Sequence, residues 1–264
     1  MAAAIETREL TRAFDDVLAL DRVSLAAAAG TIYGLLGSNG AGKSTLIKML
    51  TTLLPPTSGS ARVAGYDIVR QAQLVRARTG YVPQLVSADS QLTGRENLMM
   101  SARLYGVPRR ERERKIADAL AFMELDDAAD RLVRGYSGGM IRRLEIAQAL
   151  LHGPEVLFLD EPTVGLDPVA KQAVWTRLRE LRARGGTTIL LTTHDMEEAE
   201  LLCDHVAILH RGRVQAEGTL AELRAASGAT RLEDIFIRAA AGAIETGGDF
   251  RAVARERRTA HRLG

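Results

Sequence analysis

Cysteine, aromatic side chains and long apolar runs are all scarce in this sequence, and each scarcity excludes something. The single cysteine among 264 residues, Cys203, cannot form a disulfide within the chain, so a reducing compartment such as the cytoplasm suits the protein. Aromatic residues make up only 4%, which argues against a single-strand nucleic-acid platform of stacked rings. No run reaches the roughly 18 consecutive apolar residues of a membrane span, so we expect the chain not to cross a membrane by itself.

A strong charge of one sign is also missing. The formal net charge is +2 and charged residues make up 26%, so no global field calls for DNA or RNA as a partner. Residues 251–264 are the local exception, with five arginines against Glu256 alone, and we interpret them as a solvated basic tail. The 46% of hydrophobic residues is enough for the core of one large α/β domain.

Strand signals dominate the start of the chain. Residues 5–36 are rich in apolar strand formers, and Ala29-Gly30 indicates a hairpin. A glycine-rich loop follows, and then a predicted helix over about residues 43–53, because Pro55-Pro56 cannot continue it. Two short strands are expected next, at residues 62–64 and 81–82.

Helical patterns and buried strands alternate through the rest of the chain. From about residue 92 to residue 151, apolar side chains recur at helical spacing with few strand signals, which predicts a helical insert. Three short apolar runs are typical of fully buried parallel strands, at residues 156–159, 189–191 and 206–209. This alternation indicates βαβ units and a parallel sheet.

Capping residues mark where two of the later helices begin. Asp167-Pro168 places an N-cap residue before a proline at the first helical position. Thr219 and Glu222 have the spacing of a capping box. A further helix is predicted over residues 231–240.

The glycine-rich loop carries the strongest chemical signal. Gly37-Ser38-Asn39-Gly40-Ala41-Gly42-Lys43-Ser44 matches the pattern G-x-x-x-x-G-K-[ST]. Its glycines let the backbone wrap a polyphosphate, and the following helix presents its positive N-terminus to the same anion. Lys43 would reach the β- and γ-phosphates, and the Ser44 hydroxyl would contact Mg²⁺. A glycine-rich turn that contains Lys-Ser by chance is the alternative, and the flanking strand and helix argue against it.

Two carboxylates follow the apolar run at residues 156–159. Asp160 and Glu161 would emerge at the carboxyl end of a central strand, where open α/β sheets bind their ligands. Asp160 is placed to help hold Mg²⁺, and Glu161 to orient or deprotonate an attacking water. Alone, such a pair is commonly just a strand end, but the phosphate loop upstream strengthens the catalytic interpretation.

Two more positions resemble parts of a nucleotide site. His194 follows the predicted strand at 189–191, which suggests a γ-phosphate sensor, although a lone histidine is more often a satisfied polar group. Ser137-Gly138-Gly139 precedes a helical pattern and describes either a second anion site or an N-cap with flexible glycines. One nucleotide does not need two such sites in one chain, so the second would serve the nucleotide of a neighbouring subunit.

These elements, in this order, resemble the ABC ATPase family over roughly residues 5–225. Its Walker A loop corresponds to residues 37–45, its Walker B strand to 156–161 and its signature motif to 136–140. The remaining matches are a switch histidine at His194, a Gln-loop at Gln84, a D-loop at residues 165–167 and an adenine-stacking aromatic at Phe14.

The signature motif departs from the family's commonest wording, L-S-G-G-Q. Tyr136 and Met140 replace the outer residues, while the serine and both glycines remain, so the phosphate-contacting atoms are kept. Together with residues 157–165 and 232–238, this variant looks like the daunorubicin/doxorubicin-resistance exporter branch of the family.

The resemblance implies a fold and a domain organisation. The fold is α/β: a P-loop NTPase core with a mostly parallel sheet, an N-terminal antiparallel β subdomain and an α-helical subdomain insert. Residues 1–225 would form the nucleotide-binding domain, with the helical subdomain at about 87–151. Residues 226–264 would be a C-terminal extension, partly helical and then basic.

The resemblance also implies ATP and Mg²⁺ as cofactors and assigns residues to them. The catalytic residues would be Glu161, His194 and Gln84, and the metal ligands Ser44, Gln84 and Asp160. The nucleotide would be contacted by Phe14, Gly37, Ser38, Asn39, Gly40, Ala41, Gly42, Lys43, Ser44, Thr45, Ser137, Gly138, Gly139 and Asp167.

The function implied is that of an ATP-hydrolysing transporter subunit. Two copies would pair head to tail around two ATP molecules and drive export of a drug, antibiotic or lipid-like substrate. A separate membrane permease would hold the protein at the cytoplasmic face of the membrane, and no nucleic acid is expected as a partner. An importer motor and a soluble ABC ATPase without a transport role remain alternatives.

Overall fold

A six-stranded sheet forms the centre of the molecule. The structure is a computed structural model that describes residues 3–241, so the basic stretch 251–264 lies outside the described residues. The strand order is β11-β10-β4-β9-β8-β7, and every pairing is parallel except that of β10 with β11. The predicted mostly parallel sheet is therefore confirmed. Its strands are β4 (Ile32–Leu36), β7 (Thr79–Val82), β8 (Val156–Asp160), β9 (Thr188–Thr193), β10 (His205–His210) and β11 (Arg213–Gly218).

The three middle strands are buried along their whole length. Every residue of β4, β8 and β9 is inaccessible to solvent or nearly so. Helices cover both faces of a parallel sheet, which is why these strands appear in the sequence as continuous apolar runs without polar alternation. The predicted strands at 156–159, 189–191 and 206–209 all lie within the observed ones.

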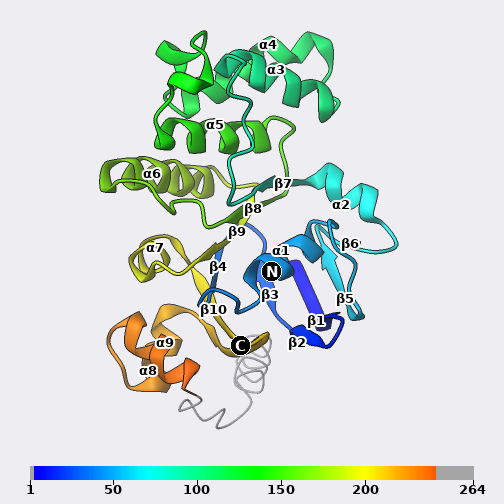
Figure 1. Cartoon of the computed structure of the whole chain (residues 1–264), viewed down its shortest axis with the longest axis vertical. Coiled ribbons are helices and arrows are strands. Elements are labelled where there is room, and N and C mark those ends of the chain that lie inside the picture. Colours follow the sequence, from blue (N-terminus) through cyan, green and yellow to red (C-terminus); the bar gives the residue numbers. More distant parts are fainter. Residues whose placement is uncertain (1–2, 242–264) are drawn as a thin grey trace, which may run out of the picture.

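A second, antiparallel sheet forms the N-terminal subdomain that the resemblance implies. Its central strand β1 (Ala3–Phe14) pairs with three others, and all of its pairings are antiparallel. The other strands are β2 (Val17–Val23), β3 (Ala26–Ala28), β5 (Ser58–Val63) and β6 (Tyr66–Asp67). In Figure 1 this sheet lies beside the central one, with helix α1 next to both.

The hairpin predicted at Ala29-Gly30 is wrong. A turn is present there, and Gly30 adopts a φ of 73°. The strands on its two sides belong to different sheets, because β3 pairs with β1 whereas β4 pairs with β9 and β10. The turn therefore joins the two sheets instead of closing a hairpin.

Helix α1 (Lys43–Leu50) packs its apolar side between the sheets. Leu46, Ile47, Met49 and Leu50 are fully buried in one hydrophobic cluster with residues of both sheets. The helix ends three residues before the predicted Leu53, because Thr52 leaves the helical conformation with a φ of 64°.

The helical insert lies between β7 and β8. It contains α3 (Gly94–Leu104), α4 (Arg109–Phe122) and α5 (Gly138–Leu150), with short 3-10 turns at Asp126–Ala128 and Val133–Gly135. A capping box of Thr93 and Glu96 begins α3. Figure 1 shows these helices gathered at one end of the molecule, and α5 lies nearest to the central sheet.

Five further helices complete the described fold. The two predicted capping sites are confirmed. The Asp167 carboxylate accepts from Ala170 N at 2.9 Å. The Thr219 side chain accepts from the backbone N of Glu222, and the Glu222 side chain accepts from the backbone N of Thr219. The helix predicted at 231–240 is also present. The five are α2 (Ala72–Arg78), α6 (Pro168–Arg184), α7 (Met196–Leu202), α8 (Leu220–Ser227) and α9 (Leu232–Ala240).

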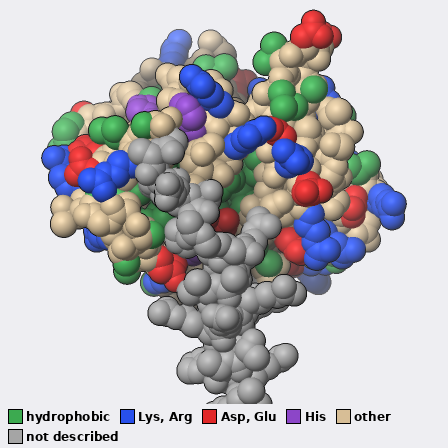
Figure 2. Space-filling view, turned by 90° about the horizontal axis from the view of Figure 1, so that it is seen from below, with side chains coloured by type: hydrophobic (Ala, Val, Ile, Leu, Met, Phe, Trp, Pro, Cys, Tyr) green, Lys and Arg blue, Asp and Glu red, His purple; other side chains and the backbone are tan. Residues whose placement is uncertain are grey.

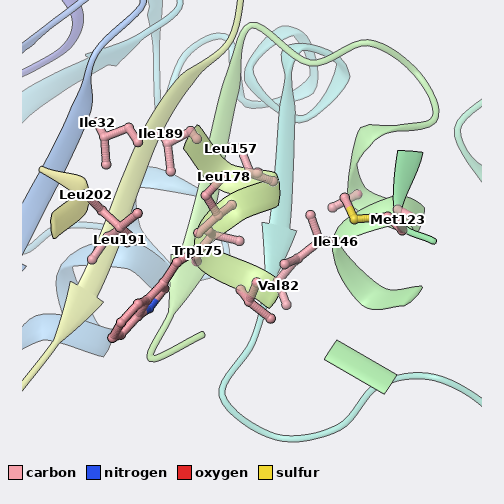
Figure 3. Close-up of a cluster of buried hydrophobic side chains, with 14 of the residues drawn as sticks. Ile32, Val82, Met123, Ile146, Leu157, Trp175, Leu178, Ile189, Leu191 and Leu202 are labelled. Carbon is pink, nitrogen blue, oxygen red and sulfur yellow. The ribbon is translucent and has the colours of Figure 1, made fainter. Parts of the chain in front are cut away.

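The larger hydrophobic cluster joins the insert to the sheet. Figure 3 shows Trp175 and Leu178 of α6 beside Leu157 of β8 and Ile189 and Leu191 of β9. Ile146 of α5 and Met123 at the end of α4 belong to the same cluster, so the helical subdomain shares its core with the sheet.

The C-terminal helices pack on that core as well. Residue 225, where we expected the nucleotide-binding domain to end, lies within α8. Leu232, Ile235 and Ala239 of α9 are buried in the larger cluster with Val206 and Ile208 of β10. The described part of the extension is thus continuous with the core.

The surface mixes charges of both signs, as the net charge suggests. On the face drawn in Figure 2, Lys and Arg side chains lie beside Asp and Glu side chains. Within residues 3–241, no helix is both long and apolar enough to span a bilayer.

Removing α9 should destabilise the whole domain. A chain of residues 1–230 keeps α8 but loses the burial of Leu232 and Ile235, each worth about 1.5–3 kcal/mol. We expect its melting temperature to fall by roughly 6 to 24 °C in a calorimetric scan. A chain of residues 1–241 keeps α9 and is the reference for this comparison. Equal melting of the two shortened chains would contradict the packing role of α9.

Candidate functional site

The loop between β4 and α1 encloses a pocket. The pocket measures about 370 Å³ and is lined by Ala19, Ser38, Asn39, Gly40, Ala41, Gly42, Lys43, Ser44, Thr45, Gln84 and Glu161. Gly40 and Gly42 have φ values of 80° and 108°, a region that favours glycine. A Cβ on Gly42 would also lie 2.7 Å from Ala19 O. The predicted phosphate loop therefore has the wrapped backbone that its glycines allow.

The Lys43 ammonium is buried inside this loop. Its Nζ donates to Gly37 O at 2.7 Å and to Ser38 O at 3.3 Å. The same nitrogen lies 3.2 Å from Glu161 Oε1, and Lys43 is only 5% exposed. A buried cation held by two carbonyls and one carboxylate is positioned to meet an anion in the pocket.

Asp160, at the end of β8, links the neighbouring strand β9 to helix α1. Its Oδ1 accepts from Thr192 Oγ1 of β9 at 2.6 Å and from Ser44 Oγ of α1 at 3.2 Å. The carboxyl ends of parallel strands meet at one edge of a sheet, which explains why residues far apart in sequence lie together here. The set of hydroxyl and carboxylate oxygens suits a hard cation such as Mg²⁺.

Glu161 lies just beyond the end of β8 in a strained conformation. Its φ is 49°, unusual for a residue with a side chain, and its backbone N donates to Thr192 Oγ1 at 3.0 Å. Backbone of this kind costs roughly 1–3 kcal/mol and is concentrated at functional sites. The result is a carboxylate aimed into the pocket and only 7% exposed.

Three polar groups from separate elements surround the Glu161 carboxylate. Lys43 contacts Oε1, while Gln84 Nε2 donates to Oε2 at 3.3 Å. His194 Nδ1 lies 3.4 Å from the same Oε2. The structure therefore brings together the predicted residues Lys43, Ser44, Gln84, Asp160, Glu161 and His194.

A second, smaller pocket of about 90 Å³ adjoins Glu161 and His194 on the side of α6 and α7. Its wall includes Lys171, whose Nζ donates to Asp195 Oδ2 at 2.6 Å, and that bond raises the pKa of Lys171. Glu198 is buried there and accepts from Thr163 Oγ1 and Trp175 Nε1. Burial raises the pKa of Glu198, although these hydrogen bonds oppose the effect.

Sequence reasoning missed Lys171, Asp195 and Glu198. Asp195 caps α7 through hydrogen bonds from Glu197 N and Glu198 N, so the Asp-Met-Glu-Glu start of that helix was an available signal. The contacts of Lys171 and Glu198 depend on how α6 packs on α7, and no local pattern indicates them.

Ser137 is an N-cap at the exposed start of α5. Its Oγ accepts from Met140 N at 3.3 Å, and neither it nor the two glycines after it lines either pocket. A Cβ on Gly139 would lie 2.7 Å from Ala170 Cβ, so this glycine lets α5 approach α6 closely. The N-cap is present and the exposed serine does not line the chain's own phosphate pocket, while contact of Ser137, Gly138 and Gly139 with the nucleotide of a second subunit stays a prediction.

The last two predicted positions lie outside the pockets. Phe14 ends β1 with 42% of its surface exposed, and the Arg12 guanidinium lies 4.5 Å from its ring centroid. Asp167 caps α6. Contact of either residue with a nucleotide stays a prediction.

Comparison with known proteins identifies the family. Residues 20–164, more than half of the chain, match the family model described as ABC transporter. The chain belongs to this family. It is therefore an ATP-binding subunit of the ABC transporter class and an ATPase, as the phosphate loop and the paired carboxylates predicted.

Curated relatives and solved structures extend over most of the chain. The daunorubicin/doxorubicin resistance ATP-binding protein DrrA of Streptomyces peucetius is 46% identical over 90% of this chain and 73% of its own length. The Nod factor export ATP-binding protein I of Rhizobium meliloti is 46% identical over 82% of this chain and 64% of its own length.

Two solved structures share the fold. The first, described as an ATP-binding subunit of an ABC transporter, has a TM-score of 0.80 and 33% identity, and covers 89% of this chain and 99% of that one. The second is cbiO1 of Clostridium perfringens, part of the transporter complex cbiONQ, with a TM-score of 0.77 and 27% identity over 90% of this chain and 98% of that one. The predicted P-loop NTPase fold is confirmed.

Replacing Lys43 should remove most of the ATP affinity of the ABC protein. Lys43→Ala leaves Glu161 without its cation and removes a charge-assisted contact, so we expect binding about tenfold to a hundredfold weaker by calorimetric titration. Lys48→Ala is the matched control, because Lys48 is an exposed lysine of the same helix. Equal ATP affinity of the two variants would contradict the assignment of the loop.

Proposed function

We propose that this protein hydrolyses ATP at sites shared between two copies of the chain and so powers export through a separate membrane permease. The proposal rests on one observation. Lys43, Ser44, Gln84 and Glu161 line one pocket, and Asp160 and His194 contact Ser44 and Glu161 directly, whereas the exposed Ser137 does not line that pocket.

The residues at the pocket have distinct roles in this proposal. Backbone N–H groups of residues 37–44 and the Lys43 ammonium bind the phosphates, and Glu161 accepts the proton of the attacking water. His194 and Gln84 hold the Glu161 carboxylate in place from two sides. Phosphoryl transfer asks mainly for such positioning and electrostatic stabilisation.

Mg²⁺ belongs to the same proposal. Ser44, Asp160 and Gln84 would hold it, since their oxygens are hard ligands and Ser44 Oγ already lies 3.2 Å from Asp160 Oδ1. When bound, it would neutralise charge on the phosphate oxygens. Two measurements test this part of the proposal. ATPase activity should require Mg²⁺, and Asp160→Asn should lose that activity.

Head-to-tail pairing would complete each site. The Ser137 hydroxyl and the first turn of α5 form an exposed donor group that does not line the phosphate pocket of its own chain. In a symmetric pair, each α5 would face the phosphates held by its partner. Asp167 at the start of α6 lies near this group, since a Cβ on Gly138 would be 3.3 Å from Cδ2 of the preceding Leu166.

Export and a permease partner are supported by the relatives and by the surface. The names of the similar proteins refer to drug resistance and to Nod factor export. Leu85 and Val86, directly after Gln84, are 82% and 63% exposed, and Leu104 of α3 is 80% exposed. Contiguous exposed apolar side chains mark protein interaction sites, so the adjacent Leu85 and Val86 are our proposed permease contact, with the protein at the cytoplasmic membrane face.

Mixing two inactive variants tests the shared site. Ser137→Ala alone and Glu161→Gln alone should each lose turnover while keeping ATP binding. A mixed pair has one complete site, formed by the Glu161 of one chain and the Ser137 of the other. We therefore expect a 1:1 mixture to recover roughly a quarter of wild-type ATPase activity, because half of the pairs are mixed and each has one working site.

The controls are each variant at doubled concentration, which should stay inactive. A mixture no more active than the single variants, with both still binding ATP, would contradict the sharing of sites between chains.

A further inference from the structure

The backbone that carries Gln84 is held by one buried arginine. Arg142 of α5 donates from Nη1 to Pro83 O at 2.7 Å and from Nη2 to Gln84 O at 3.0 Å. Arg142 is only 5% exposed. Two donor nitrogens on one rigid plane hold two successive carbonyls in a fixed relative position, whereas a lysine would offer a single nitrogen on a flexible stem.

Glu145, one turn further along α5, holds the other end of the same segment. Its Oε1 accepts from both the backbone N and the Oγ of Ser87. Its Oε2 lies 3.1 Å from Arg142 Nη1, and Glu145 is 2% exposed. Arg142 and Glu145 thus form a buried ion pair whose remaining contacts all go to residues 83–87.

Residues 84–87 have no apolar anchor of their own. All four are exposed, and Leu85 and Val86 direct most of their surface to solvent. Hydrophobic burial therefore does not fix the position of this segment. The contacts from α5 are what hold it, because a surface loop without buried side chains otherwise opens at little cost.

Both ends of this arrangement reach functional groups. Gln84 Nε2 donates to the Glu161 carboxylate at 3.3 Å, and α5 begins directly after Ser137. A continuous path of hydrogen bonds and one rigid helix therefore runs from Glu161 through Gln84 and Arg142 to Ser137.

We propose that Arg142 and Glu145 are positioning residues that clamp the Gln84 segment to α5, so that the place of Gln84 at Glu161 is set by the position of the helix that carries Ser137. This inference rests on the proposed function. When Ser137 contacts the nucleotide of a second copy, a shift of α5 moves the Gln84 amide with it. The rate of ATP hydrolysis then depends on the position of α5.

The energetics favour a positioning role over a stabilising one. A buried ion pair gives little net stability compared with apolar residues of the same size, since both charges must be desolvated. The pair instead fixes the position of the loop. Two side chains spaced three residues apart on one helix make four hydrogen bonds to it.

The test is a double-mutant cycle on the full-length protein, with Arg142→Lys combined with Gln84→Ala. Arg142→Lys keeps the charge but replaces the planar pair of donor nitrogens with one flexible nitrogen, so we expect the segment to shift and kcat to fall about tenfold to a hundredfold, the range for a small displacement of a positioning group. ATP affinity should stay within about twofold, because residues 37–44 make no contact with Arg142. In the Gln84→Ala background, Arg142→Lys should have no further effect on kcat.

Arg143→Lys is the matched control. Arg143 neighbours Arg142 on α5 and also donates to a carbonyl, that of Met123 at 2.6 Å, but it makes no contact with residues 83–87. It should leave kcat unchanged. Glu145→Gln is the second variant should Arg142→Lys fold poorly, because the amide oxygen still accepts from Ser87 while the countercharge of Arg142 is lost.

Hydrogen exchange gives a readout that does not depend on activity. Amides in residues 84–90 should exchange faster in Arg142→Lys than in Arg143→Lys, with α1 unchanged in both. An additive cycle, or equal effects of the two lysine variants on kcat and exchange, would overturn the inference. Wild-type protein without Glu161-dependent ATPase activity would instead overturn the proposed function, and the exchange comparison would still decide whether the clamp exists.

Discussion

The buried ion pair between Lys43 and Glu161 is the contact on which the rest of the site depends. It joins the loop after β4 to the end of β8, two elements separated by more than a hundred residues. Neither charge tolerates its buried position alone, and each is held further by hydrogen bonds, from Lys43 to Gly37 and Ser38 and to Glu161 from Gln84. An anion that binds Lys43 must compete with the Glu161 carboxylate, which couples nucleotide binding to the freedom of the proposed catalytic base.

The fold provides this contact through the order of its strands. Because β4, β8 and β9 are adjacent and parallel, their carboxyl ends place the phosphate loop, the two carboxylates and Thr192 at one edge of the sheet. The helical insert adds Gln84 at its start and Ser137 at the start of its last helix. Helix α5 thus contacts the chain's own site through the hydrogen bond of Arg142 to Gln84. The same helix begins at Ser137, on the surface proposed to meet a second copy.

The parts of this account that could be predicted from sequence are those fixed by local pattern. The phosphate loop, the buried strands at 156–159 and 189–191 and the caps at Asp167 and Thr219 each follow from neighbouring residues, and all are present. The prediction of a hairpin at Ala29-Gly30 was wrong, because a turn signal does not determine the pairing partners of the strands before and after the turn. The packing of α9 and the clamp of Arg142 and Glu145 were not foreseen, since both depend on contacts between distant elements.

The solution mass of the Glu161→Gln protein, measured by light scattering with ATP and with ADP, tests the central claim most directly. We propose that ATP joins two copies of the chain, because Ser137 does not line the phosphate pocket of its own chain. We expect the mass of a dimer with ATP and of a monomer with ADP, since the variant should bind ATP and hydrolyse it very slowly. A monomer in both conditions, at ATP concentrations that saturate the protein, would contradict it.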